Sequence, residues 1–346
     1  MAEQRVYQIA LAGNPNVGKS TVFNALTGMH QHTGNWAGKT VTCAEGRFSY
    51  GEKAFLLTDL PGTYSLRARS AEEEVTRDAL ADMPDAVIVV CDACCLERNL
   101  CLVLQVMELC ERVLVSVNLA DEAEKKKIHV DCELLSERLD VPVVQMSARA
   151  GDGLDALLEA LSRLLEAPVC VENRPQPAYD TLIEERVQTL TELLQSQPSP
   201  AWTALRLLEG GETGEKLLHA LPEEVQEAVK VHIELPEDWT RQRVQDTVIA
   251  AIVQLAEEIA GETVSGMQQS DAADRRADRL LANKRWGILV MLLLLACVMW
   301  LTMVGANYPS DVLAELLFSL GEQGRALLEH AAAPSWLTAL LVDGMY

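Results

Sequence analysis

Short apolar runs alternate with amphipathic stretches over the first 167 residues of the chain. Several of these runs are apolar throughout, as expected of parallel strands that helices cover on both faces. The alternation predicts an α/β domain with a mostly parallel sheet over residues 1–167. The expected strands are Val6–Ala12, Val41–Tyr50, Ala54–Thr58, Ala86–Val90, Val113–Val117 and Val143–Met146. The expected helices cover about 20–27, 71–82, 97–110, 131–139 and 153–165.

The pattern changes after a proline-containing break at 168–177, which we expect to be a linker. Beyond this break the strand signals vanish, and apolar residues recur at helical spacing, for example at Val244, Val248 and Ile252. We therefore expect a compact all-α domain over 178–260, followed by a polar connector over 261–286.

One segment has the composition of a membrane span. No charged residue occurs from Trp286 to Ser310, and a helix of roughly 20 apolar residues crosses a bilayer. We expect a transmembrane helix over 287–306, with a buried core helix as the alternative. Basic residues precede the run, which places the N-terminal domains in the cytoplasm and the C-terminal tail outside. The segment 307–346 is more polar, and we expect it to lie at the outer surface as an amphipathic segment.

Composition narrows the class of protein. The chain has 29 Lys and Arg against 51 Asp and Glu, a formal charge of −22, which argues against nucleic acid as a partner. Its nine cysteines, in a sequence with no N-terminal signal peptide, indicate reduced thiols. Cys91, Cys94 and Cys95 could hold a metal, but no second Cys or His pair at finger-like spacing accompanies them.

A phosphate-binding loop follows the first expected strand. Residues 13–20 match G-x-x-x-x-G-K-S and precede an expected helix, the context that this motif requires. The backbone amides of such a loop point at one phosphate chain, the lysine neutralises its oxygens, and the serine hydroxyl ligates Mg²⁺. The expected nucleotide-binding residues here are Gly13, Asn14, Pro15, Asn16, Val17, Gly18, Lys19, Ser20 and Thr21.

Further residues have the spacing of a magnesium site and a γ-phosphate sensor. Asp59 ends an expected strand and could hold Mg²⁺ through water, while the N–H of Gly62 could contact a γ-phosphate. Thr40 lies between this motif and the phosphate loop, where its hydroxyl could ligate the metal, although a β-branched residue also suits a strand start. We expect Mg²⁺ at Ser20, Thr40 and Asp59, with Lys19, Thr40 and Gly62 as catalytic residues.

Two later strand ends have the residues of a guanine pocket. Asp121 could accept hydrogen bonds from guanine N1–H and the exocyclic amine, a donor pair that adenine lacks. Asn118 would brace the base and the phosphate loop, and Ser147-Ala148 would offer a backbone N–H to the base. Each motif alone is weak, but their order at successive strand ends is specific. The sequence therefore predicts GTP and GDP as ligands rather than adenine nucleotides.

Two positions affect catalysis. Thr63 follows Gly62 where many GTPases have a glutamine that orients the attacking water, so we expect slow intrinsic hydrolysis or assistance from elsewhere. Asn16 could place a side-chain carbonyl near the β/γ bridge and bind a monovalent cation. It could equally support the turn of the loop itself.

These motifs together resemble the ferrous-iron transporter B (FeoB) family of bacterial membrane GTPases. The resemblance rests on GNPNVGKSTVFN at 13–24, GNWAGKTV at 34–41, DLPGTYSLRARS at 59–70 and LERNL at 96–100, with the guanine motifs after them. It continues through LLEG at 207–210 and the membrane entry at 278–304. It implies a Ras-like P-loop GTPase domain, then an all-α domain likened to a nucleotide-dissociation inhibitor, then one transmembrane helix.

The family resemblance also implies ligands and partners. It implies K⁺ at Asn16, GTP coupled to ferrous iron uptake across the bacterial inner membrane, a homo-oligomer and small iron-transport accessory proteins. A single membrane helix cannot enclose an ion path, so the permease is expected from further segments or from a separate multi-helix chain. The alternative is a nucleotide-dependent module that assembles or gates a channel formed by another chain. An RNA-acting GTPase is disfavoured by the acidic charge.

Overall fold

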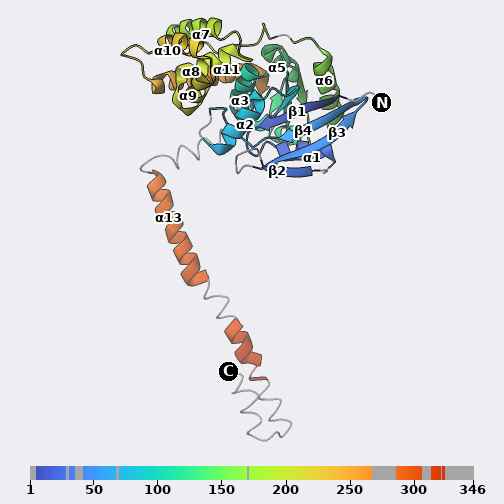
Figure 1. Ribbon diagram of the computed structural model, residues 1–346. Helices are drawn as coiled ribbons and strands as arrows, with labels where there is room; N and C mark the ends of the chain where they lie inside the picture. The colour runs from blue at the N-terminus through green and yellow to red at the C-terminus, as the bar shows by residue number, and fades with distance from the viewer. Residues whose placement is uncertain are drawn as a thin grey trace. The chain divides into compact units, whose positions relative to one another are not determined.

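A computed structural model of the chain describes residues 5–28, 31–35, 42–67, 70–169, 171–266, 286–305, 313–320 and 322–323. The chain divides into two compact units, residues 1–270 and 271–346. The first unit contains the sheet and the helices that pack around it, and it contains every described residue of the expected nucleotide site (Figure 1).

A seven-stranded sheet forms the centre of the first unit, in the order β2-β3-β4-β1-β5-β6-β8. The strands are β1 (Val6–Gly13), β2 (Gln31–Asn35), β3 (Thr42–Tyr50), β4 (Lys53–Asp59), β5 (Ala86–Asp92), β6 (Val113–Asn118) and β8 (Val143–Gln145). Strands β4, β1, β5, β6 and β8 are parallel, and β2 and β3 add an antiparallel edge. The mostly parallel sheet is confirmed. Strand β2 was not expected, because its sequence QHTGN has no apolar alternation.

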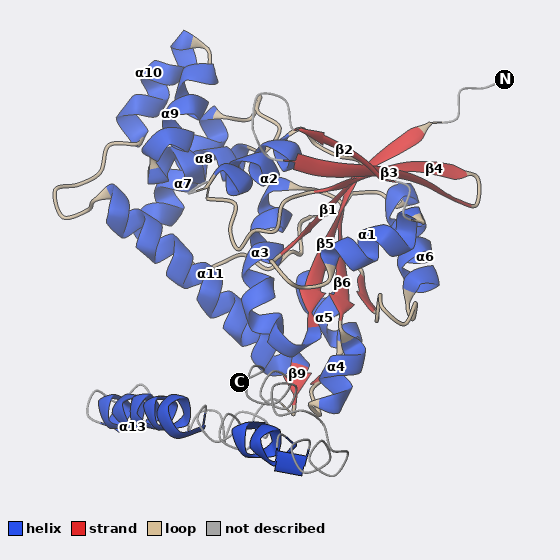
Figure 2. Ribbon diagram, turned by 90° about the horizontal axis from the view of Figure 1, so that it is seen from below, coloured by secondary structure: helices blue, strands red, loops and turns tan. Residues whose placement is uncertain are grey.

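Helices cover both faces of this sheet (Figure 2). They are α1 (Lys19–Thr27), α2 (Ala71–Ala81), α3 (Leu96–Leu109), α4 (Ala120–Lys125), α5 (Cys132–Leu139) and α6 (Leu154–Glu166). Successive strand residues point to opposite faces, so Ile9 and Leu11 join the core beside α1 and α6. Ala10 and Ala12 join the core of α3 on the other face. Burial on both faces explains why these strands are apolar throughout.

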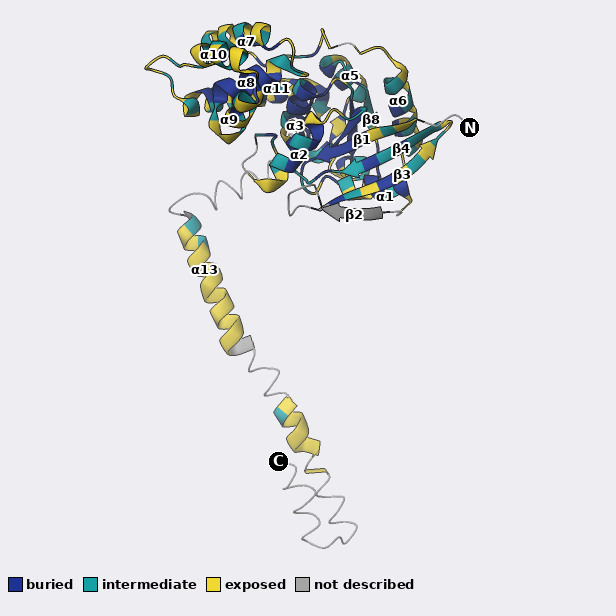
Figure 3. Ribbon diagram, in the orientation of Figure 1, coloured by how far each residue is buried: buried dark blue, intermediate teal, exposed yellow. Residues whose placement is uncertain are grey.

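The helical region shares a core with the sheet region. Its helices are α7 (Thr181–Leu193), α8 (Pro200–Glu209), α9 (Gly211–Ala220), α10 (Glu223–His232) and α11 (Arg241–Thr263). Leu190, Leu207 and Val229 belong to a core of its own, whereas Leu205 of α8 and Ile252 of α11 belong to the core that also contains α3. Buried residues accordingly run from α8 and α11 to α3 (Figure 3).

A two-stranded sheet joins the end of α11 to the segment after α4. Strand β9 (Val264–Ser265) pairs antiparallel with β7 (His129–Val130). Strand β9 lies beyond the expected all-α domain, in the expected polar connector, and a two-residue strand is too short to leave a periodic signal in the sequence. Helix α11 also continues to Thr263, past the expected domain end at 260. Gly266 has φ +84°, and a Cβ there would lie 1.9 Å from the carbonyl oxygen of Lys127.

The second unit contains α13 (Trp286–Trp300), a π-helical turn at Leu301–Gly305 and a further helical stretch over 313–320. The described apolar side chains of α13 are mostly exposed. Within the described ranges, no helix combines the length and the apolar character needed to cross a membrane. The transmembrane helix expected over 287–306 is thus unconfirmed, and most of 307–346 lies outside the described residues.

Candidate functional site

The expected site residues follow the carboxyl ends of four parallel strands. The phosphate loop follows β1, and the DLPG segment at 59–62 lies at the end of β4. The NLAD segment at 118–121 lies at the end of β6, and Ser147-Ala148 comes after β8. Because parallel strands point the same way, these loops meet at one edge of the sheet, where open α/β folds bind ligands.

The phosphate loop curls through two left-handed positions, Asn16 at φ 66° and Gly18 at φ 83°. Helix α1 begins at the next residue, Lys19, so the positive end of its dipole faces the loop. A cavity of about 980 Å³ opens here. It is lined by Asn14, Pro15, Asn16, Gly18, Lys19, Ser20, Thr21, Pro61, Gly62, Ser70, Ala71 and Glu72.

Asn118 connects the phosphate loop to the base side of the site. Its Nδ2 donates to the carbonyl oxygen of Val17 at 2.9 Å, and its Oδ1 accepts from the amide of Ala148 at 3.0 Å. The side chain is buried, so both hydrogen bonds are shielded from water. A Cβ on Gly18 would lie 2.4 Å from Asn118 Nδ2, so only glycine allows this approach. The Asn118 side chain thus links the phosphate loop to Ala148, which is the arrangement that the expected bracing role requires.

The side chain of Lys19 lies between the phosphate loop and the end of β4. Its Nζ donates to Asp59 Oδ1 and to the carbonyl oxygen of Leu60. Ser20 lines the cavity one residue further along. A hydroxyl and a carboxylate are hard oxygen donors of the kind that Mg²⁺ takes, so these residues fit that ion. Thr40 lies outside the described residues, as does Trp36.

On the base side, Asp121 lies at the start of α4, and Ser147 Oγ donates to its Oδ1 at 2.8 Å. This hydrogen bond, with a smaller contribution from Lys125, holds the pKa of the Asp121 carboxyl below its ordinary value. The carboxylate is therefore ionised at neutral pH and able to accept two hydrogen bonds. Asp121 and Ser147 line a cavity of about 600 Å³ together with Lys127 and His129.

The segment after β4 contacts the phosphate loop directly. A Cβ on Gly62 would lie 3.2 Å from Pro15 Cα, and the amide of Thr63 donates to the carbonyl oxygen of Gly13 at 3.2 Å. Thr63 is 3% exposed, and its hydroxyl donates to the Ser65 carbonyl oxygen at 2.7 Å. The Thr63 hydroxyl is therefore engaged within its own loop, and Thr63 does not line the cavity.

Several residues that hold this loop were not expected from the sequence. Arg67 donates to Glu209 of α8 and, at 3.0 Å, to the Gln245 carbonyl oxygen of α11. Gln105 of α3 binds the loop as well. These partners lie far from the loop in the chain and belong to no motif, so only the fold brings them together.

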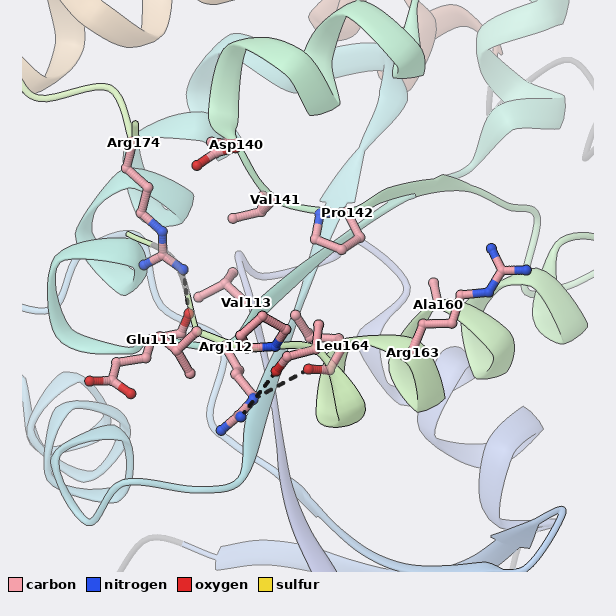
Figure 4. Close-up of a pocket in the computed structure, with 13 residues that line it drawn as sticks. Glu111, Arg112, Val113, Asp140, Val141, Pro142, Ala160, Arg163, Leu164 and Arg174 are labelled. Atoms are coloured by element: carbon pink, nitrogen blue, oxygen red, sulfur yellow. Dashed lines mark hydrogen bonds between the residues drawn. The ribbon is translucent and has the colours of Figure 1, made fainter. Parts of the chain in front are cut away.

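Another cavity, of about 400 Å³, lies at the opposite ends of the strands, where β6 begins at Val113 (Figure 4). Two of the three arginines that line it, Arg112 and Arg174, bind helix ends. Arg112 donates to the carbonyl oxygens of Leu164 and Ala167 at 3.3 and 3.4 Å, and Arg174 donates to those of Met107 and Cys110 at 2.9 and 2.8 Å. Their role is to cap the carboxyl ends of α6 and α3.

The cysteines show no metal centre in the part of the chain that the structure describes. Cys91, Cys94 and Cys95 form no disulfide, and no cluster of three or more His, Cys, Asp or Glu residues there could hold a metal ion. Burial raises the pKa of the Cys91 thiol, which keeps it protonated and unreactive.

Sequence comparisons identify relatives of both regions of the first unit. A model of the family described as "Ferrous iron transport protein B" matches residues 7–161, and one described as "FeoB cytosolic helical domain" matches residues 179–265. The Fe(2+) transporter FeoB of Escherichia coli K12 is 31% identical over 353 residues, which cover 97% of this chain and 44% of that protein. The chain thus spans less than half the length of that relative.

Solved structures agree with this likeness. The cytosolic domain of T. maritima FeoB in its GMPPNP form has a TM-score of 0.65 and 31% identity, covering 75% of this chain and 99% of that one. The same domain in a GDP form covers 75% and 100%, with the same score and identity. The cytosolic domain of L. pneumophila FeoB has a TM-score of 0.64 and 33% identity, covering 75% and 99%.

Proposed function

Because the chain belongs to the ferrous iron transport protein B family, we propose that it couples GTP binding and hydrolysis to Fe²⁺ uptake across a bacterial inner membrane. Membership confirms the family resemblance, the Ras-like domain with its helical partner, and the GTPase assignment made from the sequence. The observation that carries the proposal is the meeting of the phosphate loop, Asp59 and the Asn118–Ala148 contact at one edge of the sheet.

In this proposal the phosphates lie over the loop at 13–18. The amides at the start of α1 and the Lys19 ammonium bind the β- and γ-phosphate oxygens. Ser20, Thr40 and Asp59 hold Mg²⁺, with Asp59 acting through water. The bound ion supplies charge neutralisation of the phosphates. Gly62 lines the same cavity beside the phosphate loop, and its N–H is proposed to contact the γ-phosphate.

Hydrolysis is proposed to be slow. The side chain after Gly62 is Thr63, which is buried and bonded within its own loop, so this chain has no glutamine amide at that position. Asn16 lines the cavity at its left-handed loop position and is proposed to offer its side-chain carbonyl to K⁺. K⁺ in place of Na⁺ should then raise the GTPase rate, and Asn16→Ala should abolish that difference.

Guanine selection is assigned to the base side. The ionised Asp121 accepts from the base edge, while Ser147 holds the carboxylate and the Ala148 segment is fixed by Asn118. A titration of the full chain with GTP and ATP tests this. We expect GTP to bind at least 100-fold more tightly, since losing two hydrogen bonds to a charged acceptor costs roughly 3 kcal/mol or more. Equal affinities would reject the assignment, as would unchanged preference in Asp121→Ala.

The membrane and iron parts of the proposal depend on the sequence and on the relatives. The uncharged stretch from Trp286 to Ser310, with basic residues before it, supports one membrane helix with cytoplasmic N-terminal domains. The permease would come from further segments or another chain, and a module that gates such a channel is the alternative. Fe²⁺ uptake should be measured in cells with this chain alone and together with a multi-helix permease. Uptake by this chain alone would reject the gating module, whereas both proposals expect uptake when the permease is supplied.

A further inference from the structure

A buried glutamine of α3 holds the loop that follows Gly62. Gln105 is 6% exposed, and its Oε1 accepts two hydrogen bonds, from Ser65 Oγ at 2.9 Å and from the Leu66 amide at 3.0 Å. Its Nε2 donates to the Cys101 carbonyl oxygen at 2.8 Å. That third bond fixes the orientation of the amide, so the acceptor oxygen must face the loop.

The rest of the loop is closed by short-range contacts. The amide of Ser65 donates to Thr63 Oγ1 at 3.2 Å, and Ser65 Oγ accepts from the Arg67 amide at 3.2 Å. The guanidinium of Arg98, two helical turns before Gln105 on α3, lies 4.2 Å from the centre of the Tyr64 ring. One face of α3 therefore supports the loop from Tyr64 to Leu66.

Gly62 lies between this support and a second anchor. On its upstream side the Leu60 amide donates to the Leu11 carbonyl oxygen at 3.0 Å, and on its downstream side Thr63 bonds to Gly13. Gly62 is thus held on one side by contacts of its neighbours with the β1 strand end. On the other side it is held by Gln105, which bonds to Ser65, three residues after Gly62. A change in the backbone at Ser65–Leu66 would displace Gly62, because Thr63 and Ser65 are hydrogen-bonded to each other.

We infer that Gln105 is a positioning residue for GTP hydrolysis, which acts by holding the Ser65–Leu66 backbone so that the Gly62 N–H meets the γ-phosphate. The inference rests on the proposed role of Gly62. Gln105 itself touches neither the nucleotide cavity nor the phosphate loop in this structure. Its effect should appear only where a γ-phosphate is present.

A residue that merely stabilises the fold would have a different signature. Replacing it would lower the melting temperature and leave the preference for GTP over GDP unchanged. A positioning residue instead changes kcat and the affinity for a γ-phosphate, and leaves GDP affinity alone. These two measurements therefore separate the alternatives.

The test uses the purified full chain in detergent with Gln105→Met, which keeps the side-chain volume and removes both the acceptor and the donor. We expect kcat for GTP to fall about tenfold, as expected for two lost hydrogen bonds, with GDP affinity within twofold of wild type. Affinity for a non-hydrolysable GTP analogue should fall as well. Gln105→Glu, which retains an acceptor oxygen, should recover part of the loss.

The matched control is Asn99→Leu. Asn99 is also a buried amide of α3, and it bonds to the Asp92 amide and the Cys95 carbonyl oxygen rather than to the loop. It should lower stability without changing kcat. If Gln105→Met does not fold, Ser65→Ala removes one of the two bonds from the other side and should lower kcat about threefold.

Equal kcat for Gln105→Met and wild type overturns the inference, as does a parallel fall in GDP affinity or an equal kcat loss in Asn99→Leu. Failure of the wild-type chain to hydrolyse GTP would instead reject the proposed function itself. The same assay therefore tells the two failures apart.

Discussion

The phosphate loop and the loop from Thr63 to Arg67 lie close together at one edge of the sheet, but they are held in different ways. The phosphate loop depends mainly on its own backbone, with left-handed residues at Asn16 and Gly18, and it receives hydrogen bonds from the Asn118 side chain and the Thr63 amide. The other loop depends on three helices that are distant in the chain: it bonds to the side chains of Gln105 in α3 and Glu209 in α8, and to the backbone carbonyl of Gln245 in α11.

This difference suits the first loop to phosphate binding and the second loop to a response to the bound nucleotide. A loop held by its own backbone geometry keeps its shape whatever its neighbours do, which suits a site that must always recognise phosphate. A loop held by partners on other elements changes when those partners move, so it can connect nucleotide state to the helical region. The following experiments test that division, beginning with the largest expected effect.

Gly18→Ala should abolish nucleotide binding. The new Cβ would lie 2.4 Å from Asn118 Nδ2 at a left-handed φ, so the loop and its brace cannot both keep their positions. We expect affinity for GTP and GDP to fall by at least about 100-fold, measured by fluorescent-nucleotide titration. Gly51→Ala is the control, because it has φ +59° and nothing within 4 Å. It should bind nucleotide normally, and near-normal binding by Gly18→Ala would contradict the backbone-held description.

Arg67→Leu should weaken the helical region's hold on the second loop. The pair of Arg67 with Glu209 is largely buried, and its loss would leave Glu209 with Arg206 as its ion-pair partner among the described residues. We expect the free energy of unfolding to fall by about 3 kcal/mol, measured by chemical denaturation, with GDP affinity little changed. Arg163→Leu removes an exposed pair with Glu159 and should cost under about 1 kcal/mol. Equal losses in the two variants would show that the buried pair has no special role.

Glu108→Gln tests the charge balance around this contact. Burial raises the pKa of the Glu108 carboxyl, which receives a hydrogen bond from Tyr179 and lies in the field of Arg206, Glu209 and Arg67. A raised native pKa favours the native state below the unfolded value near 4.5, and this benefit is lost as pH rises through the native pKa. The variant should therefore melt a few degrees above wild type at pH 8 and show no such gain at pH 4. A gain independent of pH would contradict the ionisation argument.

Lys125→Ala should have the smallest effect. Lys125 Nζ lies 3.6 Å from Asp121 Oδ2 at the surface, whereas the Ser147 hydroxyl makes the dominant contribution to the lowered pKa of Asp121. We expect GTP affinity to change less than about twofold, since exposed pairs contribute little. Ser147→Ala, measured by the same titration, should weaken GTP binding more. The reverse order would show that the surface charge, rather than the hydrogen bond, prepares the carboxylate.

The sequence was sufficient for the features that depend on neighbouring residues. Strands β5 and β6 and the second half of β1 are buried on both faces and are therefore mostly apolar in sequence, and the phosphate loop is a contiguous motif. The order of strand ends then placed Asn118, Asp121 and Ser147 together, and the structure brings them within hydrogen-bond distance of their partners.

Features created by the fold could not be predicted in this way. Gln105 is one of several polar residues in α3, and only the packing of α3 against the loop gives its amide a function. Strand β2 has a polar sequence that is stabilised by pairing with β3, and the two-residue strands β7 and β9 are defined only by each other. The Thr40 expectation stays a prediction, because its residue lies outside the described ranges.

The pairing of β9 with β7 bears on where a soluble fragment should be cut. The Asp131 amide donates to the Thr263 carbonyl oxygen at 2.8 Å, and Arg138 forms ion pairs with Glu258 and Glu262 at 3.0 and 2.7 Å. A fragment that stops at 260 would leave Val130 without its partner strand and would remove one of those carboxylates. A fragment that ends just after Gly266 keeps the β7–β9 pair and both ion pairs of Arg138.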